Sequence, residues 1–145
     1  MFISITRLRI RSLIYLVPFF WMNEKVVRQL VRARGLHRGK LLIDGGRTFW
    51  TMTAWQDQQA MRDFRSSGAH MLAMPRLVAW CDEASVAHWQ SDAAELPDWE
   101  TAAGRMMAEG RLSPVERPSA AHAAGKLAPA RLHPLIGRTI HPRAS

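Results

Sequence analysis

The chain has 145 residues, of which 48% are hydrophobic and 22% are charged. This length and composition are typical of one globular domain and exclude a disordered or fibrous protein. The net charge is +8, but residues 1–50 hold ten Lys/Arg and two Asp/Glu, whereas residues 51–100 hold three and eight. The acidic middle, and the lack of a helix-turn-helix, zinc-finger or RNA-recognition pattern, argue against nucleic acid as a partner.

Cys81 is the only cysteine, so the chain cannot form an internal disulfide or a cysteine-rich metal site. We therefore predict a cytoplasmic setting and a buried, unreactive thiol. An apolar run over residues 13–22 follows three arginines, as in a signal peptide, but no small-residue cleavage pattern comes after it. The run is also much shorter than the roughly 20 residues that a bilayer-spanning helix needs. We predict no membrane span.

The first half of the chain predicts a strand, a helix and a hairpin. Residues 1–8 are rich in Ile, Phe and Thr and indicate a strand. Ser12 is a candidate cap for a helix that continues to about residue 33. Residues 36–43 and 47–54 have strand composition, and the Asp44-Gly45-Gly46 turn between them predicts an antiparallel pair.

Side chains alternate along the second strand of that hairpin. Phe49, Thr51 and Thr53 are expected on one face of the sheet. Trp50, Met52 and Ala54 are expected on the other face.

The second half predicts two helices, a strand and a less regular end. A helix begins at Asp57 and ends at Ser66-Ser67-Gly68, and a second one covers residues 69–80 with Pro75 inside it. Residues 84–89 indicate the fourth strand, and residues 96–109 a helix with proline near its start. After Ser113 the chain is rich in Pro, Ala, Gly and Arg, which favours an extended arm or partial disorder.

The order strand, helix, strand, strand, helix, strand is that of a ferredoxin-like α+β unit. From Thr53-Ala54-Trp55-Gln56-Asp57-Gln58-Gln59-Ala60-Met61 to Gly68-Ala69-His70, the chain resembles the dimeric α+β barrel superfamily. Its antibiotic biosynthesis monooxygenases and spheroidene-monooxygenase-like proteins are the most similar branches. The resemblance implies a domain over residues 1–90, followed by a C-terminal helix and irregular arm over residues 91–145.

The resemblance further implies a homodimer and a ligand pocket. A four-stranded sheet with helices on one side leaves its other side bare, and two bare sides packed together would hide both. The pocket is expected between the sheet and the helices of each subunit. Relatives use it for flat apolar ligands, so a small apolar or aromatic substrate is the expected partner.

No cofactor is expected, although haem is an alternative that the superfamily allows. In haem-degrading relatives, a helical histidine binds iron and a tryptophan ten residues earlier distorts the ring. The positions that match are Met74 and Phe64, and neither residue is of the required type. His70, one turn before Met74, is an alternative haem ligand.

His70 is the best single candidate for acid–base chemistry, because a neutral imidazole exchanges protons near neutral pH. Arg65 is the candidate for stabilising an anion. The residues expected to bind substrate are aromatic, thioether or amide side chains on the predicted strands and helices: Asn23, Trp50, Met52, Trp55, Met74 and Trp80. A structural role is the competing interpretation for each, since such residues commonly fill cores.

Two other features are interpreted as structural. Asp82 and Glu83 are expected to flank a helix-to-strand turn, and His88 to sit at a strand end. Three functional hypotheses follow from the whole sequence. The chain is an oxygenase or related tailoring enzyme, a ligand- or haem-binding dimer without chemistry of its own, or a protein whose C-terminal arm docks on a partner.

Overall fold

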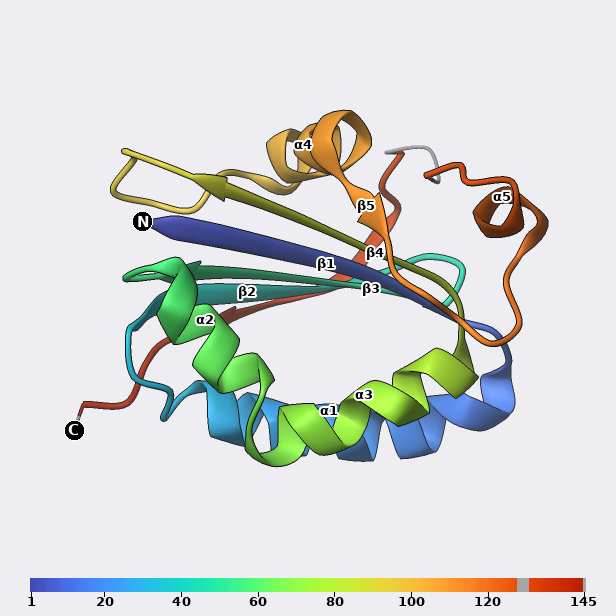
Figure 1. The fold of residues 1–145 in the computed structure, drawn as a ribbon, viewed down its shortest axis with the longest axis horizontal. Coiled ribbons are helices and arrows are strands. Elements are labelled where there is room, and N and C mark those ends of the chain that lie inside the picture. Colours follow the sequence, from blue (N-terminus) through green and yellow to red (C-terminus); the bar gives the residue numbers. More distant parts are fainter. Residues whose placement is uncertain (128–130, 145) are drawn as a thin grey trace.

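A computed structural model describes residues 1–127 and 131–144, and its helices lie on both sides of one sheet (Figure 1). The strands are β1 (Phe2–Ile10), β2 (Leu36–Asp44), β3 (Thr48–Trp55), β4 (Cys81–Gln90), β5 (Arg111–Leu112) and β6 (Pro134–Ile140). The helices are the 3₁₀ turn η1 (Leu13–Tyr15), α1 (Leu16–Leu30), α2 (Gln58–Arg65), α3 (Gly68–Trp80), α4 (Trp99–Glu109) and α5 (Ala120–Ala123). The predicted α+β class is confirmed.

The sheet is antiparallel in every pairing, with the strand order β5-β4-β1-β3-β2-β6. Its four central strands, with the helices between them, form the predicted βαββαβ unit. β1 pairs with both β3 and β4 over nearly its whole length, so it lies at the centre of the sheet. The predicted hairpin is confirmed as β2 and β3.

Local sequence signals set the helix boundaries. The Asp57 carboxylate accepts a hydrogen bond from the Ala60 N–H at 2.8 Å, and the Asp98 carboxylate accepts one from Thr101 at 2.7 Å. Each carboxylate thereby satisfies one free donor at the start of α2 or α4. Gly68 separates α2 from α3 with a φ of +57°, a backbone conformation that favours glycine. A Cβ at this position would lie only 3.1 Å from the Gln29 side-chain amide carbon, so glycine leaves room for that amide.

The helix-facing side of the sheet is packed at its two ends. At one end, Phe2 and Trp55 contact Val27, Leu30 and other residues of a buried cluster. At the other end, Ile10 and Phe49 form a second cluster with α1. Between the clusters, β1 presents Ser4, Thr6 and Leu8, and β3 presents Thr51 and Thr53. Leu41 of β2 and Ala84, Val86 and His88 of β4 lie beside them. On β1 and β3 the aromatic side chains therefore stand at the strand ends, and the middle carries mostly small hydroxyl groups.

The reverse side of the sheet is not bare, which corrects the expectation from the resemblance. α4 lies across it (Figure 1), and Ala102, Ala103 and Met106 of that helix pack on the strands. The strand residues beneath are at most 4% exposed in the single chain: Ile3, Ile5, Leu42, Trp50, Met52, Ala54 and Ala87. An uncovered sheet face is thus no reason for this chain to dimerise, because its own C-terminal helix fills that place.

The segment after α4 is more regular than its composition indicates. β6 extends the sheet beside β2, and β5 adds a short strand beside β4. The Pro/Gly content led to the expectation of an arm, but backbone pairing with an existing strand edge overrides composition.

Ionic contacts join β1 to β4, and Ser119 of the C-terminal segment bonds to one of the carboxylates involved. Asp82 and Glu83 do not flank a turn as expected, because both lie within β4. Arg9 contacts Asp82 through two hydrogen bonds of 2.9 and 2.8 Å, and Arg7 contacts Glu83 at 3.0 Å. The Ser119 hydroxyl donates to the other Glu83 oxygen at 2.7 Å. These arginines lower the pKa of both carboxyl groups against the opposing effect of burial.

Detaching α4 is expected to destabilise the fold. Ala103→Glu places a carboxylate where the side chain is 1% exposed, which is expected to cost on the order of 3–5 kcal/mol of unfolding free energy. Ala108→Glu, on the exposed side of the same helix, is the matched control and is expected to change it by less than about 0.5 kcal/mol. Urea denaturation measures both. Equal effects would show that α4 does not stabilise the sheet.

Candidate functional site

A cavity of about 480 Å³ lies between the sheet and the helices α1 and α3. β1 and β3 form its floor, α1 and α3 its roof, and β4 with residues 111–114 one side. Protein interiors are normally packed to crystal-like density, so an unfilled space of this size is unusual in a small domain. Its volume is within the range of small-molecule sites. The predicted pocket between sheet and helices is therefore present.

The floor of the cavity carries a strip of hydroxyl groups. The strand register places Ser4 opposite Thr53, and Thr6 opposite Thr51, on adjacent strands. The Thr53 hydroxyl accepts the Trp55 indole N–H at 2.8 Å and lies 3.4 Å from the Ser4 carbonyl oxygen. Thr6 and Thr51 are only partly buried, so their hydroxyls are available to a molecule in the cavity.

Above the floor the cavity is apolar. Its wall is made by aliphatic, thioether and aromatic side chains of the two helices: Phe19, Met22, Val26, Val27, Leu30, Met74, Leu77 and Val78. An apolar molecule could bury its body against these groups while polar atoms meet the hydroxyl strip.

His70 lies at the junction of α2 and α3, where Gln29 holds it in place. Its backbone N–H donates to the Gln29 side-chain oxygen at 2.8 Å, and the Gln29 amide N–H donates to the Phe64 and Ser67 carbonyls at 3.1 and 2.8 Å. The imidazole Nδ1 lies 3.1 Å from the Arg65 carbonyl oxygen, and the ring packs on Phe64 with centroids 5.0 Å apart. The contact to a carbonyl favours a proton on Nδ1 and leaves Nε2 as an acceptor.

A second histidine, His88 of β4, also lines the cavity. Its neighbour across the strands is Ser4, and its ring packs on Phe2 at 5.4 Å. Burial lowers the pKa of His88, and the positive charges of Arg111, Arg65 and Arg62 lower it further. Burial likewise lowers the pKa of His70, and this outweighs the hydrogen bond to the Arg65 carbonyl, which raises it; the Arg65 charge adds a smaller lowering. Both imidazoles are therefore neutral at pH 7, where each can accept a proton.

Arg65 and Arg111 give this end of the cavity positive charge. Both line it, from α2 and from β5, and both are exposed to solvent at their outer ends. Two guanidinium groups and two neutral imidazoles at one end of an apolar cavity suit a ligand that is or becomes an anion there.

The predicted site residues fall into two groups. His70, Arg65, Asn23, Trp55 and Met74 all line the cavity. Trp50, Met52 and Trp80 do not line it.

Trp50 and Met52 lie on the reverse face of the sheet, in the core beneath α4. Trp80 stacks on Tyr15 at 6.0 Å at the far end of α3. The alternation of side chains along the strand already predicted that Trp50 and Met52 lie on the opposite face of the sheet from Thr51 and Thr53. They were expected at the cavity because of their residue type alone.

The sequence analysis did not indicate three other features of the cavity, which are His88, Arg111 and the hydroxyl strip. Period-two alternation in β1 was the available signal, since it puts Ser4 and Thr6 on the face of Thr51 and Thr53.

Cys81 is fully buried at the start of β4, as predicted. Burial raises the pKa of its thiol to about 12, with a further contribution from Asp82. The thiolate is the reactive form of cysteine, so Cys81 is not a nucleophile at physiological pH.

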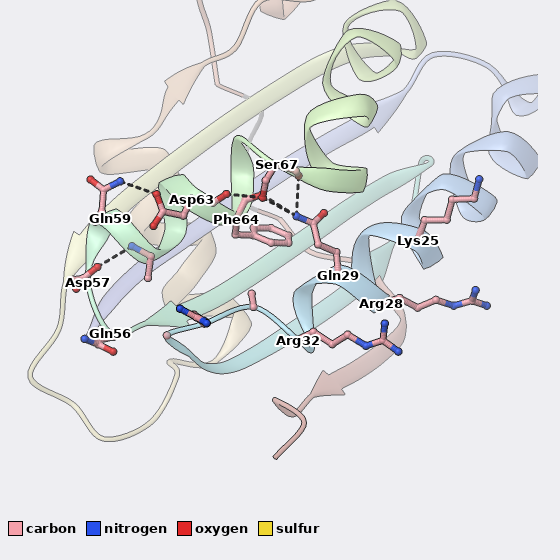
Figure 2. A pocket seen from close by; sticks show the side chains of 14 residues that line it. Lys25, Arg28, Gln29, Arg32, Gln56, Asp57, Gln59, Asp63, Phe64 and Ser67 are labelled. Atoms are coloured by element: carbon pink, nitrogen blue, oxygen red, sulfur yellow. Dashed lines mark hydrogen bonds between the residues drawn. The ribbon is translucent and has the colours of Figure 1, made fainter. Parts of the chain in front are cut away.

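A larger but open groove of about 810 Å³ lies between the end of α1 and α2 (Figure 2). Lys25, Arg28 and Arg32 project from its α1 side. On the α2 side, polar groups bond to one another: Gln59 donates to Asp63 at 2.8 Å, and the Ser67 hydroxyl donates to the Asp63 carbonyl at 2.7 Å. These polar groups serve helix ends and face solvent, so the enclosed cavity is the better candidate for chemistry.

The cavity residues do not fit the haem-degrading arrangement. The two matching positions hold Met74 and Phe64, and the Phe64 ring is packed between Trp55, at 5.3 Å, and His70.

Solved structures share this fold. A putative antibiotic biosynthesis monooxygenase from Nitrosomonas europaea superimposes with a TM-score of 0.58 at 12% identity, over 64% of this chain and 100% of that chain. Another antibiotic biosynthesis monooxygenase gives 0.58 at 14% identity, over 64% and 100%. SnoaB, a cofactor-independent oxygenase from Streptomyces nogalater, gives 0.53 at 15% identity, over 67% and 97%.

The chain therefore shares its ferredoxin-like α+β fold with solved antibiotic biosynthesis monooxygenases, as the resemblance in the sequence implied. The sequence itself matches no protein-family model and no curated protein. At these identities the likeness establishes the fold. The superfamily fold supports more than one chemistry, so the reaction must be inferred from the residues of the cavity.

The two buried histidines predict a pH dependence of stability. Because folding lowers the pKa of each below the usual 6.5, the unfolded chain binds more protons in acid, and stability present above that value is lost as the pH falls. Urea midpoints at about pH 7.5 and about pH 5.5 are expected to differ less in His70→Gln than in the wild type. His37→Gln, at an exposed position, is the control. If the difference between the two urea midpoints were the same in His70→Gln as in the wild type, burial would not lower the pKa of the His70 imidazole.

Proposed function

We propose that the chain is a small-molecule oxygenase or related tailoring enzyme that acts on a flat apolar substrate in the cavity between sheet and helices. The observation that carries the proposal is the asymmetry of the cavity. Its walls on α1 and α3 are apolar, whereas one end combines His70, His88, Arg65 and Arg111. An apolar site with a few converging polar groups is the usual form of a site that binds and orients one reactive position.

The chemistry that this end supports is proton removal from an acidic C–H or O–H group. A neutral imidazole of His70 or His88 accepts the proton, and Arg65 or Arg111 stabilises the resulting carbanion or oxyanion. Such electron-rich anions react with O₂. The balanced overall reaction converts a methylene group and O₂ to a carbonyl group and water, with no external reductant. The apolar walls exclude water and hold the substrate against the hydroxyl strip.

The fold likeness supports this proposal in a limited way. SnoaB is a cofactor-independent oxygenase, and the residues of this cavity likewise supply a base and an anion site without requiring a bound group. A homodimer, expected from the resemblance, remains part of the proposal.

Oxygen uptake with a panel of phenols, polyenes and anthrone tests the proposal. Anthrone is a flat tricyclic ketone with an acidic methylene, and its product would be anthraquinone. Replacing the base is expected to lower the rate on the order of a hundredfold, in His70→Ala or in His88→Ala. His37→Ala, outside the cavity, is expected to retain the wild-type rate.

Two results would decide against this function. Equal rates of oxygen uptake in the wild type, His70→Ala and His88→Ala would show that neither histidine acts as the base. Binding of the panel compounds, measured by calorimetry, without any oxygen uptake would identify a ligand-binding protein instead, which is the second hypothesis from the sequence.

A further inference from the structure

The outer surface of the helix layer exposes large apolar side chains that nothing in the described chain covers. On η1 and α1, Leu13, Ile14, Val17 and Trp21 are 68%, 73%, 78% and 69% exposed. On α3, Leu72 is 70% exposed. Single exposed apolar residues are ordinary, but several gathered on one face mark an interaction surface. We call these five residues the outer apolar face.

The residues of this face lie together because of helix geometry. Ile14, Val17 and Trp21 follow one another at intervals of three and four residues, so they form one stripe on the side of α1 opposite the buried Phe19 and Val27. α3 runs antiparallel beside α1 (Figure 1), since Tyr15 stacks on Trp80 at one end and Gln29 bonds to Ser67 at the other. Leu72, one turn into α3, therefore lies beside the second half of α1.

The same face is basic. The stripe of α1 continues from Trp21 into Lys25 and Arg28, and Arg32 follows it, with all three side chains projecting from the helix (Figure 2). The Lys25 ammonium lies 5.4 Å from the centre of the Trp21 ring. Arg76 is the only charged residue of α3 and is exposed. The one acidic residue of α1, Glu24, is engaged by Arg138 at 2.7 Å.

We propose that this face docks on an anionic lipid surface. Charge complementarity selects the occupant: Lys25, Arg28, Arg32 and Arg76 meet anionic headgroups, while Ile14, Val17, Trp21 and Leu72 enter the boundary between headgroups and acyl chains. Tryptophan with an adjacent lysine suits this boundary, because the indole is apolar with one polar group and the lysine stem reaches outward to the charge. Within residues 1–127 and 131–144, no helix is long and apolar enough to cross a membrane, so the docking is peripheral.

A second copy of the chain is a poorer match to the same face. A two-fold contact over this face would take the basic residues of α1 and α3 of both copies out of water without acidic partners, which is unfavourable. No free acidic residue of these two helices is available to offset that cost, because Glu24 already pairs with Arg138.

Flotation of the full chain with lipid vesicles tests the inference. Vesicles of phosphatidylcholine with phosphatidylglycerol are expected to carry the protein, and pure phosphatidylcholine vesicles to carry at least tenfold less, since each basic residue near an anionic surface contributes roughly fivefold. Val17→Glu with Trp21→Glu is expected to lower binding to the anionic vesicles at least tenfold. Lys25→Glu with Arg28→Glu is expected to abolish the preference for them.

Met107→Glu is the matched control, because Met107 is 41% exposed on α4, across the sheet from this face. It is expected to bind as the wild type does, and circular dichroism checks that all variants fold. Absence of flotation, or flotation that the Val17/Trp21 and Lys25/Arg28 variants leave unchanged, would overturn the inference. So would a dimer in sedimentation that forms without lipid and is lost in the Val17/Trp21 variant, because the face would then belong to a second copy.

Discussion

The cavity depends on where large and small side chains stand along β1 and β3. Phe2, Ile10, Phe49 and Trp55 occupy the ends of the helix-facing side and contact the helices there. Between them the strands carry serine and threonine, which are too short to reach α1 and α3. Strands of regular pleat and helices held at both ends cannot close that space, so it persists as a cavity.

A cavity on one side of a sheet weakens packing there, and the other side compensates. Burial of Ile3, Ile5, Met52 and their neighbours beneath α4 is nearly complete. Ser119 attaches the segment after α4 to β4 of the same sheet, since its hydroxyl donates to the Glu83 carboxylate and its backbone N–H to the Asp82 carbonyl. The C-terminal third is therefore part of the folding unit, and it allows the helix-facing side to remain incompletely filled.

Periodicity and turn residues predicted the elements through α4, because those signals are local. They also predicted which residues of β3 share a face. They did not predict β6, whose strand conformation comes from pairing with β2, or the contact between α4 and the sheet. Among the predicted site residues, His70 and Arg65 line the cavity, and a glycine break in the sequence marks the helix junction beside them. Trp50 and Trp80 lie outside it, because tryptophan fills cores as readily as it lines cavities.

The position of α4 has a consequence for a single molecule of the protein in dilute solution. Helices of one polypeptide lie on both sides of the sheet, and α4 buries the strand residues beneath it. Those strand residues should therefore stay covered in a single molecule at high dilution. Proteins that complete a barrel by pairing lack this independence, because separating the subunits uncovers their sheets.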